Sequence, residues 1–211
     1  YVHKVNEKKI YFSSSIQSLL EVIDKKEISK EALFFYQNLG RNDSTETFVS
    51  GIKKIEPAQL IIFGKNFFIK RKNFLKFKFS KKKISKKEKK QKIETIISSQ
   101  FISDVPIALS LSGGIDSNVI YHCLRKYYKR DFKIYSFYFK DYDKFNEDFK
   151  IAEKNARFYN HEFNPVIVGY NDFIDNAEKT IEILEEPLRS EASVLNYVMA
   201  KNIKEKVLIT G

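Results

Sequence analysis

The second half of the chain alternates short apolar runs with segments whose apolar residues recur every three or four positions. The apolar runs are typical of strands buried on both faces, and the spaced segments are typical of amphipathic helices. The predicted strands are residues 107–111, 132–139, 162–168 and 207–209. Because strand–helix alternation of this kind favours right-handed βαβ units, we expect an α/β fold with a parallel sheet.

The first half has a different pattern and is expected to form a separate α+β part. We predict strands at 9–12 and 59–63, a hairpin turn at 64–66, and helices at 15–23 and 29–39. The basic run KKKISKKEKKQK at 81–92 contains almost nothing apolar and is expected to be a solvated linker. The predicted parts are therefore 1–79, a linker at 80–92, and 93–211.

The hexapeptide SGGIDS at residues 112–117 lies where the strand 107–111 ends and a helix begins. Open α/β sheets bind ligands at such junctions. Adjacent glycines let the backbone approach a ligand, and the N–H groups of a helix N-terminus favour an anion. Ser112 and Ser117 add hydroxyl groups. An ordinary turn with Asp116 or Ser117 as the N-cap is the alternative, but six residues in this order and context favour a phosphate site.

Asp116 is a poor phosphate ligand by itself. Its carboxylate suits Mg²⁺, which takes oxygen ligands and bridges protein and phosphate groups. The sequence contains neither the GxxxxGK[ST] pattern of a Walker loop nor a GxGxxG pattern. The phosphate site is thus expected to belong to another class of nucleotide-binding loop.

The SGGIDS segment resembles the pyrophosphate loop of N-type ATP pyrophosphatases, which cleave ATP between the α and β phosphates. The longer stretch 103–117 is similar to the segment that enters this loop in glutamine-dependent asparagine synthetases. Weaker matches to that family follow in order at 133–139, 145–147, 161–162, 185–187 and 210–211. Residues 12–16 and 51–57 resemble the end of the family's N-terminal nucleophile glutaminase domain. The resemblance therefore spans nearly the whole chain.

The resemblance implies an enzyme that uses ATP and Mg²⁺ to adenylate the side-chain carboxylate of aspartate and releases pyrophosphate. Ammonia from glutamine then displaces AMP to give asparagine. The residues implied for ATP and pyrophosphate are Leu111, Ser112, Gly113, Gly114, Asp116, Ser117, Phe137, Thr210 and Gly211. Among them, Asp116 is implied for Mg²⁺, Leu111 and Phe137 lie near the nucleoside, and Thr210-Gly211 closes the pocket.

The catalytic residues themselves are expected beyond Gly211 and before Tyr1. The chain begins with Tyr1 and its single methionine is Met199, so we expect a piece of a longer protein that makes no amide by itself. A homodimer of the full-length protein is compatible with the resemblance. Four positions depart from the family pattern and leave the acceptor carboxylate open. Ser15 stands where the family usually has glutamate, Tyr138 where glycine is common, and Asn146 and Glu185 where aspartate is usual.

The net charge of +11 comes mostly from lysines spread along the chain. It favours a solvated surface over a specific nucleic-acid site. The basic and aromatic stretch 70–79 is likewise expected to be a strand with one solvated face.

The sequence has no apolar run long enough for a membrane span. A single cysteine, Cys123, excludes an internal disulfide and fits a cytoplasmic protein. We expect Cys123 to be buried and inert, and His161 to be structural.

Three alternatives remain from the sequence. The first is a similar amidotransferase that acts on another carboxylate. The second is an enzyme that uses the same loop to modify tRNA, for which the positive charge is the only support. The third is a nucleotide-binding module without catalytic activity.

Overall fold

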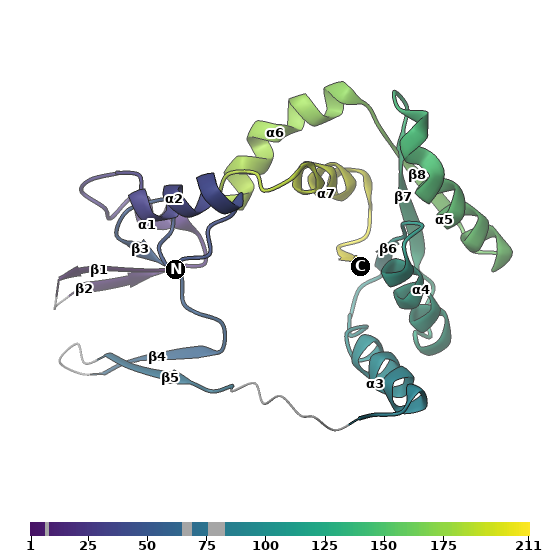
Figure 1. Cartoon of the computed structure of the whole chain (residues 1–211), viewed down its shortest axis with the longest axis horizontal. Coiled ribbons are helices and arrows are strands. Elements are labelled where there is room, and N and C mark those ends of the chain that lie inside the picture. Colours follow the sequence, from purple (N-terminus) through teal and green to yellow (C-terminus); the bar gives the residue numbers. More distant parts are fainter. Residues whose placement is uncertain (7–8, 65–68, 76–82) are drawn as a thin grey trace. The chain divides into compact units, whose positions relative to one another are not determined.

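The computed structural model describes residues 1–6, 9–64, 69–75 and 83–211, and the chain divides into two compact units (Figure 1). The first unit comprises Tyr1–Lys81 and Ile181–Arg189, and the second comprises Lys82–Thr180 and Ser190–Gly211. None of the helices in the described ranges is long and apolar enough to cross a membrane.

The first unit combines two small antiparallel sheets with two helices. Its elements are β1 (Val2–Asn6), β2 (Lys9–Phe12), α1 (Ile16–Leu20), α2 (Lys30–Leu39), β3 (Ile52–Lys53), β4 (Gln59–Phe63) and β5 (Ile69–Asn73). One sheet has the order β2-β1-β3, and β4 pairs with β5. The buried residues Ile16, Leu19 and Ile52 form its core.

Several predictions for this unit are confirmed and two are modified. Helix α2 begins after its N-cap Ser29, whose hydroxyl accepts from the Ala32 N–H at 3.3 Å. The helix predicted at 15–23 ends at Leu20, because the chain turns there and packs Val22 and Ile23 against the core. The strand predicted at 70–79 is β5, which ends at Asn73. Residues 65 and 66 of the predicted hairpin turn and residues 76–79 lie outside the described ranges.

The second unit is built on a four-stranded parallel sheet, as predicted, with the order β8-β7-β6-β9. Its strands are β6 (Ile107–Ser110), β7 (Lys133–Phe139), β8 (Phe163–Val168) and β9 (Val207–Ile209). The central strand β6 pairs with β7 on one side and with β9 on the other. Its residues Ala108 and Leu109 are fully buried, which explains why the run is apolar throughout.

Helices cover both faces of this sheet. The helical elements in the described part of this unit are α3 (Lys86–Ser98), α4 (Ile115–Tyr127), the short η2 (Asp143–Asn146), α5 (Glu147–Phe158), α6 (Tyr170–Leu184) and α7 (Glu191–Asn202); α6 continues into the first unit and belongs to neither core cluster of the sheet. One core cluster joins α4 and α5 to the sheet, and the other joins α7 to it. Burial of each leucine-sized side chain contributes about 1.5–3 kcal/mol, so these two clusters fix the helices on the sheet.

The strand order determines where a ligand can bind. From β6 the chain adds β7 and β8 on one side, and it later adds β9 on the opposite side of β6. The loops that follow β6 and β9 therefore leave the sheet at a topological switch point, where open parallel sheets form a crevice at the carboxyl ends of their strands. The SGGIDS segment follows β6, and Thr210-Gly211 follows β9.

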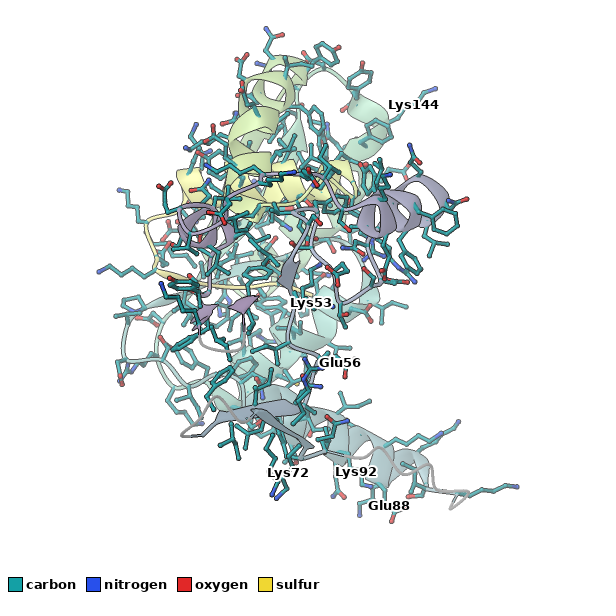
Figure 2. All side chains as sticks on the ribbon, turned by 90° about the vertical axis from the view of Figure 1, so that its left-hand side faces the viewer. Lys53, Glu56, Lys72, Glu88, Lys92 and Lys144 are labelled. Carbon is teal, nitrogen blue, oxygen red and sulfur yellow. The ribbon has the colours of Figure 1, made fainter. Side chains whose placement is uncertain are left out.

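Helix α3 was not predicted and begins within the expected linker. Residues 86–92 are exposed, as a solvated stretch should be, but they are helical; Glu88 and Lys92 are labelled in Figure 2. Ser85 is the N-cap, and its side chain and that of Glu88 form a reciprocal capping box. Lysine and glutamate are good helix formers, so the capping box starts a helix in a segment with little apolar surface.

A buried carboxylate ties α3 to α4. Glu94 is only 9% exposed, and its Oε2 accepts from Tyr127 Oη at 2.7 Å and from Lys126 Nζ at 3.1 Å. The hydrogen bonds from Tyr127 and Lys126 lower the pKa of Glu94 to about 2. The ionised form is therefore favoured in the folded protein.

The hydrogen bonds from Tyr127 and Lys126 to Glu94 predict a specific dependence of stability on pH. The pKa of Glu94 falls from 4.5 to about 2 on folding, so its contribution is fully present above pH 4.5 and is lost as the pH falls towards 2. We expect Glu94→Gln to destabilise the protein at pH 5.5 and to have much less effect near pH 2. Urea unfolding followed by circular dichroism at both pH values measures this difference.

Tyr127→Phe is the matching test, because it removes the hydroxyl donor and leaves the ring. The loss caused by Glu94→Gln should be smaller in the Tyr127→Phe background than in the wild type. An equal loss of unfolding free energy in both backgrounds, or at both pH values, would contradict this role of the Glu94 carboxylate.

Candidate functional site

The loop after β6 extends the sheet by one residue and then leaves it. The Leu111 N–H donates to the Tyr135 carbonyl at 2.9 Å, and the Leu111 side chain is 1% exposed. Residues 112–114 then turn away from the sheet, and α4 begins at Ile115. The end of β6 is thus anchored, so the residues that follow start from a fixed point at the edge of the switch-point crevice.

Hydroxyl groups hold the loop closed on itself. The Ser117 Oγ lies 2.9 Å from the Ser112 carbonyl, 3.1 Å from the Gly114 carbonyl and 2.9 Å from the Ser112 Oγ. The Ser112 N–H also donates to the Ser117 Oγ at 3.2 Å. Ser117 is buried, and in this conformation its hydroxyl stabilises the loop; its contact with phosphate stays a prediction.

The N-terminus of α4 has backbone N–H groups without a side-chain cap. Its N-cap is Gly114, and no side-chain cap hydrogen bond is made there. The first N–H groups of any α-helix have no partner within the helix, and the helix dipole makes this end partly positive. Ile115 and Asp116, in the first turn, are both exposed. The backbone N–H groups of Ile115 and Asp116 could therefore donate to an anion at the end of β6.

Two glycines allow backbone segments to approach the loop closely. A Cβ atom at Gly113 would lie 2.8 Å from the Cα of Asp148, on α5. A Cβ atom at Gly211 would lie 3.0 Å from the backbone nitrogen of Ser117. The contact at Gly113 would force a shift of the backbone, so this position requires glycine for the packing seen here. The contact at Gly211 is tight and would need a shift of a few tenths of an ångström. The segment Thr210-Gly211 therefore lies against the first turn of α4.

The remaining predicted residues are placed differently from one another. Leu111 belongs to the core cluster on the α4 and α5 face, and Phe137 packs with the cluster on the α7 face. The sheet separates these two side chains, so only the backbone of Leu111 is available at the strand ends. Tyr138, where the family often has glycine, packs its ring against Phe149 at 5.2 Å between centroids.

The carboxylate of Asp116 fits an Mg²⁺ ion that is held mainly by phosphate groups. Within the described part of the chain, no cluster of three or more His, Cys, Asp or Glu side chains could hold a metal. Mg²⁺ in nucleotide sites commonly takes one or two carboxylates and completes its shell with phosphate oxygens and water. The single exposed carboxylate of Asp116, beside the first turn of α4, meets this requirement. By itself it could not form a structural metal site, which needs several protein ligands.

Two asparagines at this loop were missed by the sequence analysis. The Asn118 Nδ2 donates to the Gly114 carbonyl at 2.8 Å and to the Ser112 carbonyl at 3.3 Å. The Asn155 Nδ2, on α5, donates to the Asn118 Oδ1 at 2.8 Å. The available signal was weak: asparagine is a poor residue for the interior of a helix, and both residues lie within helices.

His161 and Cys123 were predicted to be structural and inert, respectively. The His161 Nδ1 lies 3.2 Å from the Tyr121 Oη, and its ring packs edge-on against Phe132. Burial, together with the charge of Arg125, lowers the pKa of His161. Cys123 is fully buried, and burial raises the pKa of its thiol. The first environment disfavours the protonated imidazole, and the second disfavours the reactive thiolate.

Two departures from the family pattern contact each other within the first unit. Ser15 donates its hydroxyl to Glu185, and the carboxylate of Glu185 also accepts from the N–H groups of Ile16 at 2.7 Å and Gln17 at 3.0 Å. Burial alone would raise the pKa of Glu185, but these hydrogen bonds outweigh it and lower the pKa. Glu185 thus caps the N-terminus of α1, where Ser15 itself makes no cap bond.

A third departure, Asn146, also has a structural reason. It is fully buried, its Oδ1 accepts from the Phe139 N–H at 2.8 Å, and its Nδ2 donates to the Phe139 carbonyl at 2.9 Å. An amide satisfies both backbone groups at the end of β7. The aspartate that the family usually has could accept from the N–H group, but when ionised it could not donate to the carbonyl.

We therefore predict that Asn146→Asp destabilises the second unit by about 1–3 kcal/mol at pH 7, because it buries a charge beside an unpaired carbonyl. The deficit should shrink below about pH 4, where a protonated aspartate regains a donor. Urea unfolding at both pH values measures this. Asn164→Asp is the matched control, since Asn164 is half-buried and makes one longer bond, 3.3 Å to the Ile134 carbonyl. Equal stability of Asn146→Asp and wild type at pH 7 would contradict this role of the two hydrogen bonds between Asn146 and the Phe139 backbone.

Comparison with known proteins identifies the family. The family model described as asparagine synthase matches residues 88–211. The chain is 25% identical to asparagine synthetase [glutamine-hydrolyzing] 1 of Bacillus subtilis (strain 168), over 99% of this chain and 33% of the relative. It is 22% identical to asparagine synthetase [glutamine-hydrolyzing] 3 of the same organism, over 94% of this chain and 35% of the relative.

The chain thus spans about a third of the length of the curated relatives that it matches. The family model covers more than half of the chain, including the parallel sheet, the loop after β6 and the segment after β9. This chain belongs to the asparagine synthase family.

Proposed function

We propose that the chain carries the ATP-binding part of a glutamine-dependent asparagine synthetase. The observation that carries this proposal is the place of SGGIDS. It follows the central strand of a parallel sheet at the switch point, and it leads into a helix whose N-terminus makes no side-chain cap hydrogen bond. Membership of the asparagine synthase family supports the same conclusion.

In this proposal the loop binds the β and γ phosphates of ATP, which leave as pyrophosphate. The backbone N–H groups of Gly113 and of the first turn of α4 donate to the phosphate oxygens, and the Ser112 hydroxyl adds a donor. Mg²⁺, held by Asp116, supplies positive charge to the phosphates when bound. Thr210-Gly211 closes the site from β9, and the nucleoside lies over the strand ends near Leu111 and Phe137.

The proposed reaction has two steps. A side-chain carboxylate oxygen of aspartate attacks the α phosphorus of ATP, and the bond from this phosphorus to the bridging oxygen of the β phosphate breaks. Ammonia then attacks the carbonyl carbon of the aspartyl adenylate, and AMP leaves. The loop contributes positioning and stabilisation of the charge that develops on the leaving pyrophosphate. Asparagine, AMP and pyrophosphate are the products.

We further propose that residues 1–79 are the C-terminal part of a glutaminase-like domain, that 80–92 connect the parts, and that 93–211 begin the synthetase domain. Support comes from the two relatives, whose names include glutamine hydrolysis and whose matches cover 99% and 94% of this chain. Glutamine would then be the source of ammonia.

A similar amidotransferase acting on another carboxylate is the second candidate. The observation that favours it is the change at Tyr138, near the carboxyl end of β7, and at Asn146, in η2, whose side chain bonds Phe139 at that strand end. The acceptor can be identified by incubating the full-length protein with ATP, glutamine and a panel of carboxylates, followed by product analysis.

We predict that Asp116→Ala in the full-length protein lowers carboxylate-dependent ATP–pyrophosphate exchange by at least about 100-fold, because the charge on the leaving group loses a stabilising partner. The fold should be retained, since Asp116 is exposed. Asp131→Ala is the matched control: it removes another exposed aspartate, which precedes β7 at the opposite end of the sheet.

Unchanged exchange in Asp116→Ala would overturn the assignment of the loop. If the wild-type protein binds ATP but shows no exchange with any carboxylate, a non-catalytic nucleotide-binding module is the better description. Exchange with a carboxylate other than aspartate would support the second candidate.

A further inference from the structure

We propose that Asn118, held in place by Asn155, is a positioning residue for the phosphate loop. Its role is to keep the carbonyl groups of Ser112 and Gly114 turned towards α4, so that the site presents N–H groups to the anion. This inference rests on the proposed function in that the anion is the pyrophosphate part of ATP. The geometry of the loop itself stands independently of that assignment.

A phosphate loop has to present the positive ends of its peptide dipoles to the anion and keep the negative ends away from it. Each peptide group carries a donor and an acceptor, so a loop that offers N–H groups to an anion must direct its carbonyl oxygens elsewhere. A carbonyl oxygen facing phosphate would repel it. In this loop the carbonyl groups of Ser112 and Gly114 flank the two glycines, and both accept hydrogen bonds from α4.

Ser117 cannot hold both carbonyl groups alone. Its Oγ lies within 3.1 Å of each of them, but a serine hydroxyl has one proton and can donate to one acceptor at a time. The Asn118 Nδ2 carries two protons and reaches the same two oxygens, at 3.3 and 2.8 Å. The Gly114 carbonyl also accepts the Asn118 backbone N–H at 3.2 Å. The two amide protons of Asn118 therefore reinforce the bonds that the first turn of α4 makes to both carbonyl groups.

Asn155 determines which way the amide of Asn118 faces. Its Nδ2 donates to the Asn118 Oδ1 at 2.8 Å, so the oxygen of Asn118 faces α5 and the nitrogen faces the loop. If the amide turned over, its oxygen would face two carbonyl oxygens. The same helix α5 also contacts Gly113 through the backbone of Asp148. Helix α5 thus holds the loop both directly and through Asn118.

The test uses three variants of the full-length protein. Asn118→Ala removes the two donors. Asn155→Asp replaces the donor to Asn118 with a carboxylate, which attracts the Asn118 Nδ2 and draws the amide away from the loop. The double variant completes the cycle.

Asn176→Ala is the matched control. Asn176 also donates to the carbonyl four residues earlier, that of Asp172, at 2.6 Å, and its Oδ1 also accepts from a neighbouring helix, through Lys201 Nζ at 2.9 Å. It lies on α6, away from the loop after β6. It therefore reports the effect of losing an amide with similar hydrogen bonds without a change at the loop.

The first measurement needs no ligand. Hydrogen–deuterium exchange of the peptide that contains residues 111–117 should be faster in Asn118→Ala and in Asn155→Asp, and unchanged in Asn176→Ala. The second measurement is the KM for Mg-ATP in ATP–pyrophosphate exchange. It should rise at least about tenfold in both loop variants, with a smaller change in the maximal rate. The effect of Asn155→Asp should vanish in the Asn118→Ala background.

Loop exchange equal to wild type in Asn118→Ala would overturn the inference, as would additive effects in the double variant. An equal change of the loop in Asn176→Ala would do the same, because it would indicate general destabilisation. If the wild type shows no ATP–pyrophosphate exchange with any carboxylate, the proposed function fails. The hydrogen-exchange result still decides whether Asn118 positions the loop.

Discussion

The pairing of β6 with strands on both of its sides is the constraint on which the second unit depends. The strand register aligns Ile107 with Val207 and Leu109 with Ile134. Strands β7 and β9, which are far apart in the sequence, therefore pair with the two sides of β6. This places the residues that follow β6 beside those that follow β9, although about 100 residues separate them in the sequence. Four-residue β6 thereby sets the position of SGGIDS, α4 and Gly211 relative to one another.

The sequence predicted the part of this arrangement that follows from periodicity. Buried parallel strands are apolar on both faces, and the helices between them repeat every three or four residues, so the α/β fold and the position of SGGIDS could be read directly. The residues around the loop could not be read in the same way. Asn118 and Asn155 come into contact only when α5 lies beside α4, and the bonds that Ser117 makes within the loop have no signal in the sequence. Helix α3 was missed because a capping box, together with lysine and glutamate propensity, starts it in a segment with little apolar surface.

The departures from the family pattern show how a substitution is explained by its neighbours. Ser15 and Glu185 are 170 residues apart, yet the hydroxyl of one donates to the carboxylate of the other. A glutamate at position 15 would place a second carboxylate at the same helix N-terminus, which would raise the cost of ionising both. Serine at position 15 therefore suits a glutamate at 185. Asn146 likewise matches the backbone of Phe139 with one donor and one acceptor. Neither the pairing of Ser15 with Glu185 nor that of Asn146 with Phe139 can be inferred from one sequence position alone.

Under the proposed function, the loop has to bind a group with several negative charges without offering it side chains of opposite charge. In SGGIDS the only charged side chain is that of Asp116, which carries the same sign as phosphate. The attraction must then come from oriented backbone dipoles and from a cation held by that carboxylate. Dipoles attract an anion only while they point the right way, so their orientation has to be fixed before ATP arrives. In the structure the first turn of α4 has no side-chain cap, and Ser117 and Asn118 donate to the carbonyl groups of the loop. Rigidity of the loop is therefore a requirement of its chemistry, and the side chains behind it contribute as much to that requirement as the residues that face the ligand.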